Sequence, residues 1–552
     1  MLSKYYPVIK KLVFSNKKYS FMIFISITLM NFSEIVLVSL IAPIYDLLSE
    51  TEFNFISKYI NSIFIKIGFE LNIISASVAL IIFGLIISIM RLYSSWLVYT
   101  VKNNFMFDLS SKFTLSTLKA DYNKLSKENS GNLINILTLE MERAGGSLLI
   151  IFNFFRDLIL SLGLIFFLAI VSLKLLILFI LIFLPLTLLI RYLHNRIEIA
   201  SSKISTSNRV FLNHIKEIFD NIKDIKSMSV VDNSYNWVIK DAGSRLNAYK
   251  EASILSAIAE NVQHFIMLLG LGVIVILSKV YLLIPSAEII LVIGGIVRLS
   301  PKITSAQRSL AEFLTLLPGF NLVTSMVSKL DKTQNINISK GSKIDLVAKS
   351  INVNNISFKY DGSSEIIKNF SCQINKGEIT AIYGKSGSGK STLLNMLLGL
   401  INPHKGEIIL SPNSETPYHE YIFDNVGYLG QESGLFDFTI KENIKFFNDA
   451  DNSEIDQLLK EFDLDSRFIL DEELVGDKGI SLSAGQRQRI LLIRSLIKKP
   501  HLLFLDEATN NLDKKTENII YQKLNDVKKD MFIILITHNK NVEEIADKVI
   551  YV

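Results

Sequence analysis

The sequence predicts two structural classes in one chain: a membrane-embedded bundle of α-helices, then an α/β domain with a parallel sheet. First, of 552 residues 49% are hydrophobic and 20% are charged, with a mean hydropathy of +0.35, which is more apolar than soluble domains usually are. Second, the long uncharged runs are confined to the first half. Third, short apolar runs alternate with helical patterns beyond residue 350, an order typical of α/β domains.

The composition also excludes several classes of protein. An apolar content this high excludes a disordered chain. Cys372 is the only cysteine, so the sequence excludes a disulfide scaffold and a cysteine-ligated metal site. The net charge of +5, from 58 basic and 53 acidic residues, is too small to indicate a nucleic-acid partner.

Six apolar segments are candidates for membrane-spanning helices. Leu71–Met90 contains no charged residue and would be about 30 Å long as a helix, which matches the hydrocarbon core of a bilayer. The last segment is interrupted by Pro285 and Glu288, but an even number of spans is needed to return the second half to the side of the N-terminus. The six are Tyr19–Tyr45, Leu71–Met90, Leu158–Leu173, Leu175–Ile190, Asn261–Ser278 and Tyr281–Leu299.

Basic residues indicate which ends of these spans face the cytoplasm. Five lysines lie in residues 1–18, six Lys or Arg in residues 102–143 and ten in residues 191–250. By the positive-inside rule, the chain would have both termini and the second half in the cytoplasm. Helical spacing predicts that spans continue past the bilayer as Leu133–Arg143 and Asn208–Lys226, with polar turns near Asp121–Ser130 and Val230–Trp237 at the far tips.

The composition changes near Lys329. Residues 331–350 are polar and read as a linker, so we predict a membrane domain over 1–328, a linker over 329–349 and an α/β domain over 350–552. In the last of these, Ile379–Tyr383, Leu502–Leu505 and Phe532–Thr537 are continuous apolar runs, typical of strands buried on both faces.

Residues 384–391 fit the phosphate-loop pattern G-x-x-x-x-G-K-[ST]. They follow the strand Ile379–Tyr383 and open a helix at Thr392, the context that separates a phosphate loop from a chance match. The glycines let backbone N–H groups turn toward phosphates, Lys390 would reach the β and γ phosphates of ATP, and Ser391 would ligate Mg²⁺. The predicted ATP-binding residues here are Gly384, Lys385, Ser386, Gly387, Ser388, Gly389, Lys390, Ser391 and Thr392.

Two adjacent carboxylates, Asp506 and Glu507, end the apolar run Leu502–Leu505. A buried strand in such a sheet delivers its last residues to the edge where ligands bind. Asp506 is therefore predicted to hold Mg²⁺, and Glu507 to orient or deprotonate the attacking water.

The order of motifs from Tyr360 to His538 resembles the nucleotide-binding domain of ATP-binding-cassette (ABC) transporters. The motifs are Tyr360, Gly384–Thr392, Gln431, Leu482–Gln486, Asp506–Glu507, Asp513 and His538. By this resemblance Tyr360 stacks on adenine, Gln431 senses Mg²⁺ as a metal ligand, and His538 contacts the γ-phosphate. The signature loop of Ser483, Ala484, Gly485 and Gln486 caps the nucleotide of a partner subunit, and Asp513 lies at the dimer interface.

The resemblance extends to the membrane half, whose six spans with long cytoplasmic extensions resemble ABC exporters. One membrane domain with one nucleotide domain makes a half-transporter, and because its motifs are intact we expect a homodimer rather than a heterodimer. The signature has Ala484 where the family mostly has glycine, which adds a methyl group near the phosphate. By the same resemblance the tips at Asp121–Ser130 and Val230–Trp237 are coupling helices.

Two short stretches, 31–43 and 297–301, look like parts of bacterial lipid-linked oligosaccharide flippases. Charges inside spans are expensive in lipid and are candidates for contact with cargo. We predict Glu34, Arg91 and Arg298 as such residues, with the adjacent Arg156 and Asp157 as a further candidate pair. Arg91 and Arg298 could bind a phosphate headgroup through the planar fork of the guanidinium. The alternative is that Glu34 pairs with one arginine as a tie between helices.

By these resemblances, the predicted function is ATP-driven export or flipping of a lipid-like or lipid-linked oligosaccharide cargo across a bacterial cytoplasmic (inner) membrane. One alternative is a peptide or polysaccharide exporter, and another is an ATP-gated regulator or channel. The intact carboxylate at Glu507 favours a working ATPase over the last of these.

Overall fold

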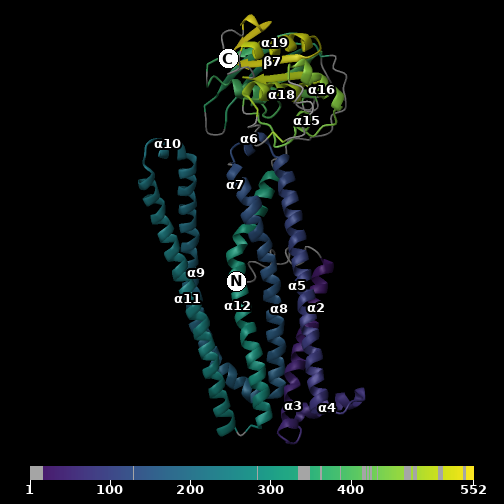
Figure 1. The fold of residues 1–552 in the computed structure, drawn as a ribbon, viewed down its shortest axis with the longest axis vertical. Helices are drawn as coiled ribbons and strands as arrows, with labels where there is room; N and C mark the ends of the chain where they lie inside the picture. Colours follow the sequence, from purple (N-terminus) through teal and green to yellow (C-terminus); the bar gives the residue numbers. More distant parts are fainter. Residues whose placement is uncertain are drawn as a thin grey trace. The chain divides into compact units, whose positions relative to one another are not determined.

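The computed structural model describes residues 17–128, 130–282, 284–332, 348–360, 364–385, 387–412, 418, 422, 425–431, 433–464, 474–475, 482–507, 514–538 and 543–552. The chain divides into two compact units, Met1–Phe113 with Ile134–Ser325, and Thr114–Leu133 with Met326–Val552. Figure 1 draws the long helices in purple to teal and the strands of the second unit in green to yellow.

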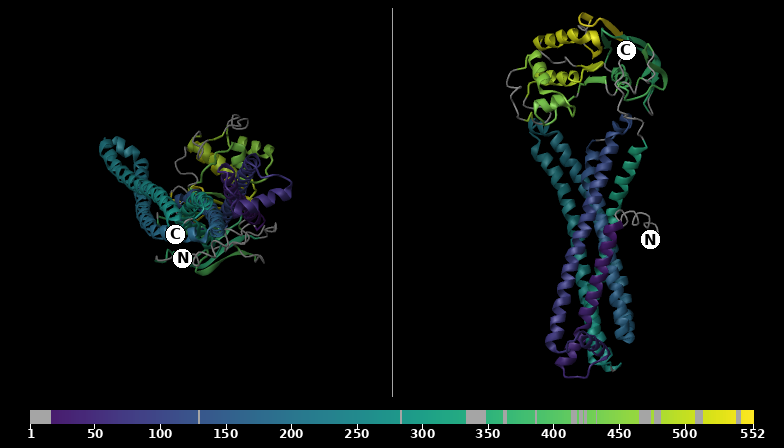
Figure 2. Two further views of the ribbon diagram at one scale, coloured as in Figure 1. Left: turned by 90° about the horizontal axis from the view of Figure 1, so that it is seen from below. Right: turned by 90° about the vertical axis from the view of Figure 1, so that its right-hand side faces the viewer.

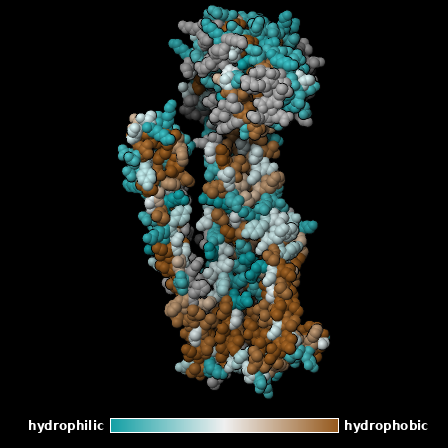
Figure 3. Space-filling view, in the orientation of Figure 1, coloured by the Kyte–Doolittle hydropathy of each residue, from teal (hydrophilic) through white to brown (hydrophobic). Residues whose placement is uncertain are grey.

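The apolar runs of the first half lie in long helices, as predicted. Four helical stretches of the described residues are long and apolar enough to cross a membrane, and α9 and α11 add the shorter apolar stretches Leu173–Ile182 and Phe265–Val280. Figure 3 shows hydrophobic side chains gathered at one end of these helices. The helices are α2 (Lys17–Ser39), α3 (Ile41–Leu48), α4 (Phe55–Ile67), α5 (Ile73–Leu118), α8 (Met141–Val171), α9 (Leu173–Asp220), α11 (Val231–Val280) and α12 (Ser286–Asp331).

The first predicted polar tip holds a short helix, α6 (Tyr122–Leu125), whose first turn is capped by the Asp121 carboxylate, which accepts a hydrogen bond from the backbone N–H of Lys124. Two further helical segments, α7 (Ser130–Asn135) and the π-helix η1 (Ile136–Glu140), lead into α8.

The second tip is not where we predicted it. The turn lies at Met228–Val230, after the short helix α10 (Ile222–Ser227), and Ser229 there has a φ of +58°. Residues 231–237 already belong to α11. The error arose because Asp232, Asn233 and Ser234 read as turn residues, whereas near a helix start an acidic residue is favoured by the helix dipole.

The second unit contains two sheets. A three-stranded antiparallel sheet has the order β2-β1-β4, and a five-stranded parallel sheet has the order β5-β6-β7-β3-β8. The strands are β1 (Ser350–Phe358), β2 (Ile367–Asn375), β3 (Ile379–Tyr383), β4 (Lys405–Ser411), β5 (Val426–Leu429), β6 (Leu502–Asp506), β7 (Phe532–Thr537) and β8 (Lys548–Tyr551). The helices are α13 (Lys390–Leu397), α15 (Ile440–Lys445), α16 (Asn452–Glu461), α18 (Ala484–Leu496) and α19 (Lys514–Val527), followed by the short η3 (Lys528–Asp530).

The parallel sheet is buried on both faces, which explains its continuous apolar strands. In β7, Ile533 and Leu535 point to a core shared with α15, α16, α18 and α19. Phe532, Ile534 and Ile536 point to the other core, shared with α13 and the antiparallel sheet. Figure 2 shows this layered unit from two further directions.

Candidate functional site

The strand order brings the predicted nucleotide residues to one edge of the parallel sheet. Strands β5, β6, β7 and β3 are neighbours and run parallel, so their carboxyl ends share an edge. Gln431 follows β5, Glu507 follows β6, His538 follows β7, and the loop beginning at Gly384 follows β3. Residues separated by more than a hundred positions therefore meet, as ligand sites in such sheets do.

Glu507 lies at the centre of this group. Its Oε2 accepts a hydrogen bond of 2.7 Å from Gln431 Nε2, and its Oε1 lies 2.9 Å from His538 Nδ1. The backbone of Glu507 has a φ of +53°, a left-handed conformation that is strained for a residue other than glycine. The Glu507 N–H donates to Ile536 O at 2.9 Å, which ties the strained residue to the neighbouring strand.

The phosphate loop has the backbone that its glycines predict. Gly387 and Gly389 have φ values of +81° and +101°, which other residues rarely adopt. Lys390 opens α13 and is buried, and its Nζ donates to Gly384 O at 2.8 Å and to Lys385 O at 2.9 Å. The loop therefore curls around the ammonium of its own lysine.

The chemistry of these residues fits a magnesium-bound polyphosphate. The Ser388 hydroxyl is buried and has no hydrogen-bond partner among the described residues, so it can serve an added oxygen ligand. Burial raises the pKa of the Asp506 carboxyl above its ordinary value; the charge of Glu507 raises it further, and Lys390 lowers it. Two adjacent carboxylates that repel each other in a half-buried place are typical of a cation site.

Other predicted nucleotide residues are placed as follows. Tyr360 follows β1, half-buried, with its ring edge-on to Phe358 at a centroid distance of 5.0 Å. On α13, Thr392 is buried and Ser391 is exposed. Ser386 and Asp513 lie outside the described residues.

The signature residues form the N-terminus of α18. The Ser483 hydroxyl accepts from the Gln486 N–H, and the Gln486 side chain accepts from the Ser483 N–H, which completes a capping box. The residue at the third signature position, Ala484, is exposed. Since α18 and α13 pack on opposite faces of the parallel sheet, the signature residues and the phosphate loop belong to different layers.

Sequence reasoning missed Arg494, which joins α18 to the segment after Gln431. Its guanidinium donates to Asn443 O at 2.8 Å, Asn443 Oδ1 at 2.7 Å and Gly434 O at 3.0 Å. It also lies over the Phe446 ring, and burial lowers its pKa to about 10. One signal was present in the sequence: a single basic residue inside the apolar run Ile490–Leu496.

In the membrane helices, Glu34 of α2 and Arg91 of α5 are brought together. Arg91 NH2 lies 3.5 Å from Glu34 Oε1, and the Glu34 side chain is only 4% exposed whereas that of Arg91 is 55% exposed. This geometry matches the tie between helices that we named as the alternative to cargo contact. Arg298 is an exposed residue of α12.

A second polar cluster, centred on Asp157 of α8, was only partly foreseen. The Asp157 side chain is 1% exposed and lies 3.2 Å from Arg156 Nε and 3.9 Å from Lys302 Nζ. Ser305 of α12 donates its hydroxyl to the same carboxylate. Sequence reasoning noted Arg156 and Asp157 but missed Lys302 and Ser305, which lie beyond the last predicted span.

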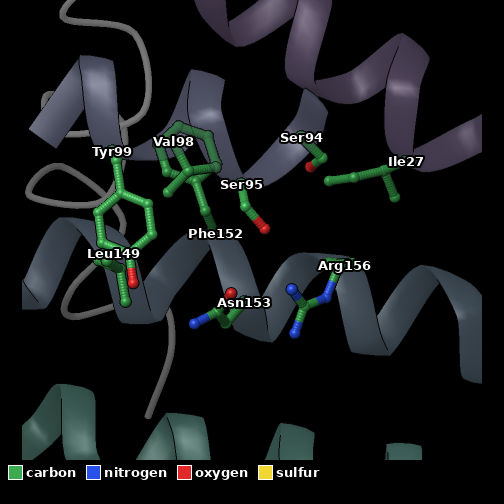
Figure 4. Close-up of a pocket in the computed structure, with 9 residues that line it drawn as sticks. All are labelled: Ile27, Ser94, Ser95, Val98, Tyr99, Leu149, Phe152, Asn153 and Arg156. Carbon is green, nitrogen blue, oxygen red and sulfur yellow. The ribbon is translucent and has the colours of Figure 1, made fainter. Parts of the chain in front are cut away.

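A cavity of about 210 Å³ opens between α2, α5 and α8 beside this cluster. Its polar lining comes from Ser94, Ser95, Tyr99, Asn153 and Arg156, and Figure 4 shows Arg156 and Asn153 side by side on α8 along its wall.

Known proteins resemble both halves of the chain. Residues 367–510 match the ABC transporter family. A putative export ATP-binding/permease protein of Rickettsia prowazekii is 26% identical over 506 residues, 88% of this chain and 86% of that protein. ABC transporter B family member 1 of Dictyostelium discoideum is 25% identical over 503 residues, 87% of this chain, but the match spans only 54% of that protein.

A solved structure has the same fold. A bacterial Atm1-family ABC exporter with ATP bound superposes with a TM-score of 0.71 over 97% of this chain and 93% of that one, at 18% identity. The predicted fold class, a membrane-helix bundle of the exporter type with an α/β nucleotide-binding domain, is confirmed.

Proposed function

We propose that this chain, which belongs to the ABC transporter family as a half-transporter of the exporter type, uses ATP hydrolysis to drive a cargo out of the cytoplasm. The observation that carries this is the meeting of Lys390, Gln431, Glu507 and His538 at one sheet edge of a chain that also has membrane-length apolar helices. The test is ATP hydrolysis by the purified chain in liposomes, with transport read from a fluorescent lipid. ATPase activity without any vectorial movement would contradict it.

In this proposal each residue at the sheet edge has one task. The phosphate loop holds ATP, and Lys390 exchanges its hydrogen bonds to the carbonyl oxygens of Gly384 and Lys385 for hydrogen bonds to phosphate oxygens. Ser391, Gln431 and Asp506 would hold Mg²⁺, which neutralises phosphate charge when bound.

Glu507 accepts a proton from the attacking water or orients it. Gln431 and His538 hold the two oxygens of its carboxylate in place.

Two copies of the chain are needed. The signature residues and the phosphate loop lie on opposite faces of one sheet, which supports an arrangement in which Ser483 of each copy caps the ATP held by the other. A homodimer is the simplest such assembly because one chain carries both halves of the site. Residues 1–328 would form the membrane domain, 329–349 a linker and 350–552 the cytoplasmic ATPase domain, with the chain in a bacterial inner membrane.

Ser483 has a matched control in Thr439, which caps α15 with the same type of capping box. Replacing either residue with alanine is expected to lower the free energy of unfolding by about 1 kcal/mol, because each removes one cap. Only Ser483→Ala should also reduce ATP hydrolysis, since only Ser483 is proposed to contact nucleotide. Thermal unfolding in the absence of nucleotide measures the first effect, and the ATPase rate measures the second. Equal ATPase rates in the two variants would show that Ser483 acts only as a helix cap.

The cargo proposed is an amphiphile with an anionic headgroup, such as a lipid-linked oligosaccharide. Among the described residues of the two clusters in the membrane helices, Arg91, Arg156 and Lys302 face two carboxylates, Glu34 and Asp157, so positive charges outnumber negative ones by one. Uncompensated charge is expensive in lipid, and an anionic group would offset it. This observation favours a lipid headgroup over the alternative cargo, a peptide.

The position of the cavity along α8 agrees with entry of such a headgroup from the cytoplasmic side. Arg156 lies fifteen residues before the end of α8 at Val171, or about 22 Å along the helix. A hydrocarbon core is about 30 Å thick, so Arg156 lies nearer the cytoplasmic side.

Arg156→Gln is expected to abolish stimulation of the ATPase by undecaprenyl phosphate in liposomes, because the fork that would bind phosphate is lost. The control is Arg308→Gln, which removes an exposed arginine that pairs with Glu312 one turn away on α12. Stimulation that survives in Arg156→Gln would contradict the assignment. Stimulation by peptides alone would favour the peptide exporter instead.

A further inference from the structure

Helix α4 lies in the connection between the first two spans and is defined at both ends. The Asn54 side chain accepts from the Ser57 N–H at 2.8 Å, which caps the N-terminus. Gly68 ends the helix with a φ of +88°, and its N–H donates to Ile65 O at 3.0 Å. These caps indicate a helix specified by its own sequence rather than an irregular loop.

One face of α4 is fixed to the end of the first span. The buried Asp46 carboxylate of α3 accepts from Ser57 Oγ at 2.6 Å and from the Asn54 N–H at 3.1 Å. Ser57 is fully buried and Ile60, one turn further on, is 8% exposed. The helix is therefore held against α3 in a set rotation.

That rotation leaves an apolar stripe uncovered. Phe55, Tyr59, Ile63 and Ile67 are spaced four residues apart, so they follow one side of the helix, and they are 78%, 65%, 39% and 66% exposed. A polar stripe of Lys58, Ser62 and Lys66 runs beside it with the same spacing, and all three are exposed. Water would be an unfavourable environment for the first stripe and a favourable one for the second.

The stripe continues a surface that faces lipid. Figure 1 draws α4 at the end of the bundle, next to α3 and near the start of α5, projecting to one side. The first turns of α5 expose Ile74, Val78 and Ile81 at 75%, 48% and 60%, as a membrane span does. Figure 3 shows the hydrophobic surface at this end of the bundle.

We propose that α4 is an interfacial helix that lies in the outer leaflet, with its apolar stripe among the acyl chains and its lysine stripe at the headgroups. The occupant is the phospholipid surface, because the stripe is continuous with the lipid-facing side of α5, and because aromatic rings and lysines beside it are the residues that membrane interfaces favour. Nearby Glu50, Glu52 and Glu70 offset Lys58 and Lys66, so insertion depends on apolar contact rather than on anionic lipid. Placement of α4 in the outer leaflet rests on the proposed function, in which residues 350–552 lie in the cytoplasm.

The test uses spin labels on the full chain in nanodiscs. In a Cys372→Ser background, the label is attached at Tyr59→Cys or Ile63→Cys on the apolar stripe, and at Lys58→Cys or Ser62→Cys on the polar stripe as matched controls. Oxygen concentrates in lipid, and a nickel chelate stays in water. We expect faster collisions with oxygen than with nickel at 59 and 63, the reverse at 58 and 62, and the same pattern with zwitterionic or anionic lipid.

Three results would overturn the proposal. Nickel collisions dominating at 59 and 63 would place the stripe in water, and low collision rates with both reagents would place it against protein, as a second copy would. A pattern that appears only with anionic lipid would contradict insertion by apolar contact. ATPase activity of each labelled variant reports folding and tests the transport proposal separately, so the two can fail independently.

Discussion

Lys390→Ala is expected to abolish ATP hydrolysis. Lys390 supplies the one ammonium that the phosphate loop encloses, held by the carbonyl oxygens of Gly384 and Lys385. Removing it leaves those two oxygens without their donor and the phosphates without their counter-charge. Loss of one preorganised charge at a reacting group lowers turnover on the order of 10²–10³-fold. Steady-state phosphate release at saturating ATP measures the change.

The matched control is Lys405→Ala, which removes an exposed lysine of β4 from the same unit. Its turnover should equal that of the unmodified chain. Nucleotide binding by Lys390→Ala, measured with a fluorescent ATP analogue, separates loss of binding from loss of chemistry. Normal turnover in Lys390→Ala would remove residues 384–391 from the proposed ATP site.

Glu507→Gln is expected to bind ATP but to hydrolyse it slowly, so that two copies remain closed around nucleotide. The amide keeps the shape of the carboxylate and can still accept from Gln431 and donate to His538, so the geometry at 2.7 Å and 2.9 Å is preserved. What is lost is the ability to take a proton from water. General-base catalysis contributes about 10²–10⁴-fold to rate. Retained radiolabelled ATP after gel filtration, together with phosphate release, measures both effects.

Glu407→Gln provides the control, because Glu407 is an exposed glutamate on β4. It should retain normal turnover and trap no ATP. Normal hydrolysis by Glu507→Gln would show that another group activates water. Slow hydrolysis without trapped ATP would instead contradict the closed two-copy state.

Features that depend on a few neighbouring residues in the chain were predictable from the sequence. The runs Ile379–Tyr383, Leu502–Leu505 and Phe532–Thr537 form strands where predicted, since burial on both faces demands an uninterrupted apolar pattern. The backbone of the phosphate loop was equally predictable, because it depends on the spacing of nearby glycines and on the helix that follows directly. The family resemblance drawn from these motifs, a half-transporter of the exporter type, is confirmed by the comparisons.

Boundaries and long-range contacts were less predictable. The second polar tip was placed several residues too late, since Asp232 and Ser234 suit both a turn and a helix start. The partners of Arg494 could not be predicted from the sequence, because Asn443 and Gly434 are brought to it only by folding. The Asp157 cluster likewise joins α8 to α12, more than a hundred residues away.

The sequence alone determined which segments are apolar enough for lipid, which loop has the phosphate-loop pattern and which strand carries the paired carboxylates, because hydrophobic periodicity and glycine spacing act over a few residues. Only the tertiary structure decided that Gln431, Glu507 and His538 share hydrogen bonds, that Glu34 pairs with Arg91, and that α4 turns its apolar stripe outward. These outcomes depend on strand order and helix rotation. Both are set by the packing of the whole unit, which no short stretch of residues encodes.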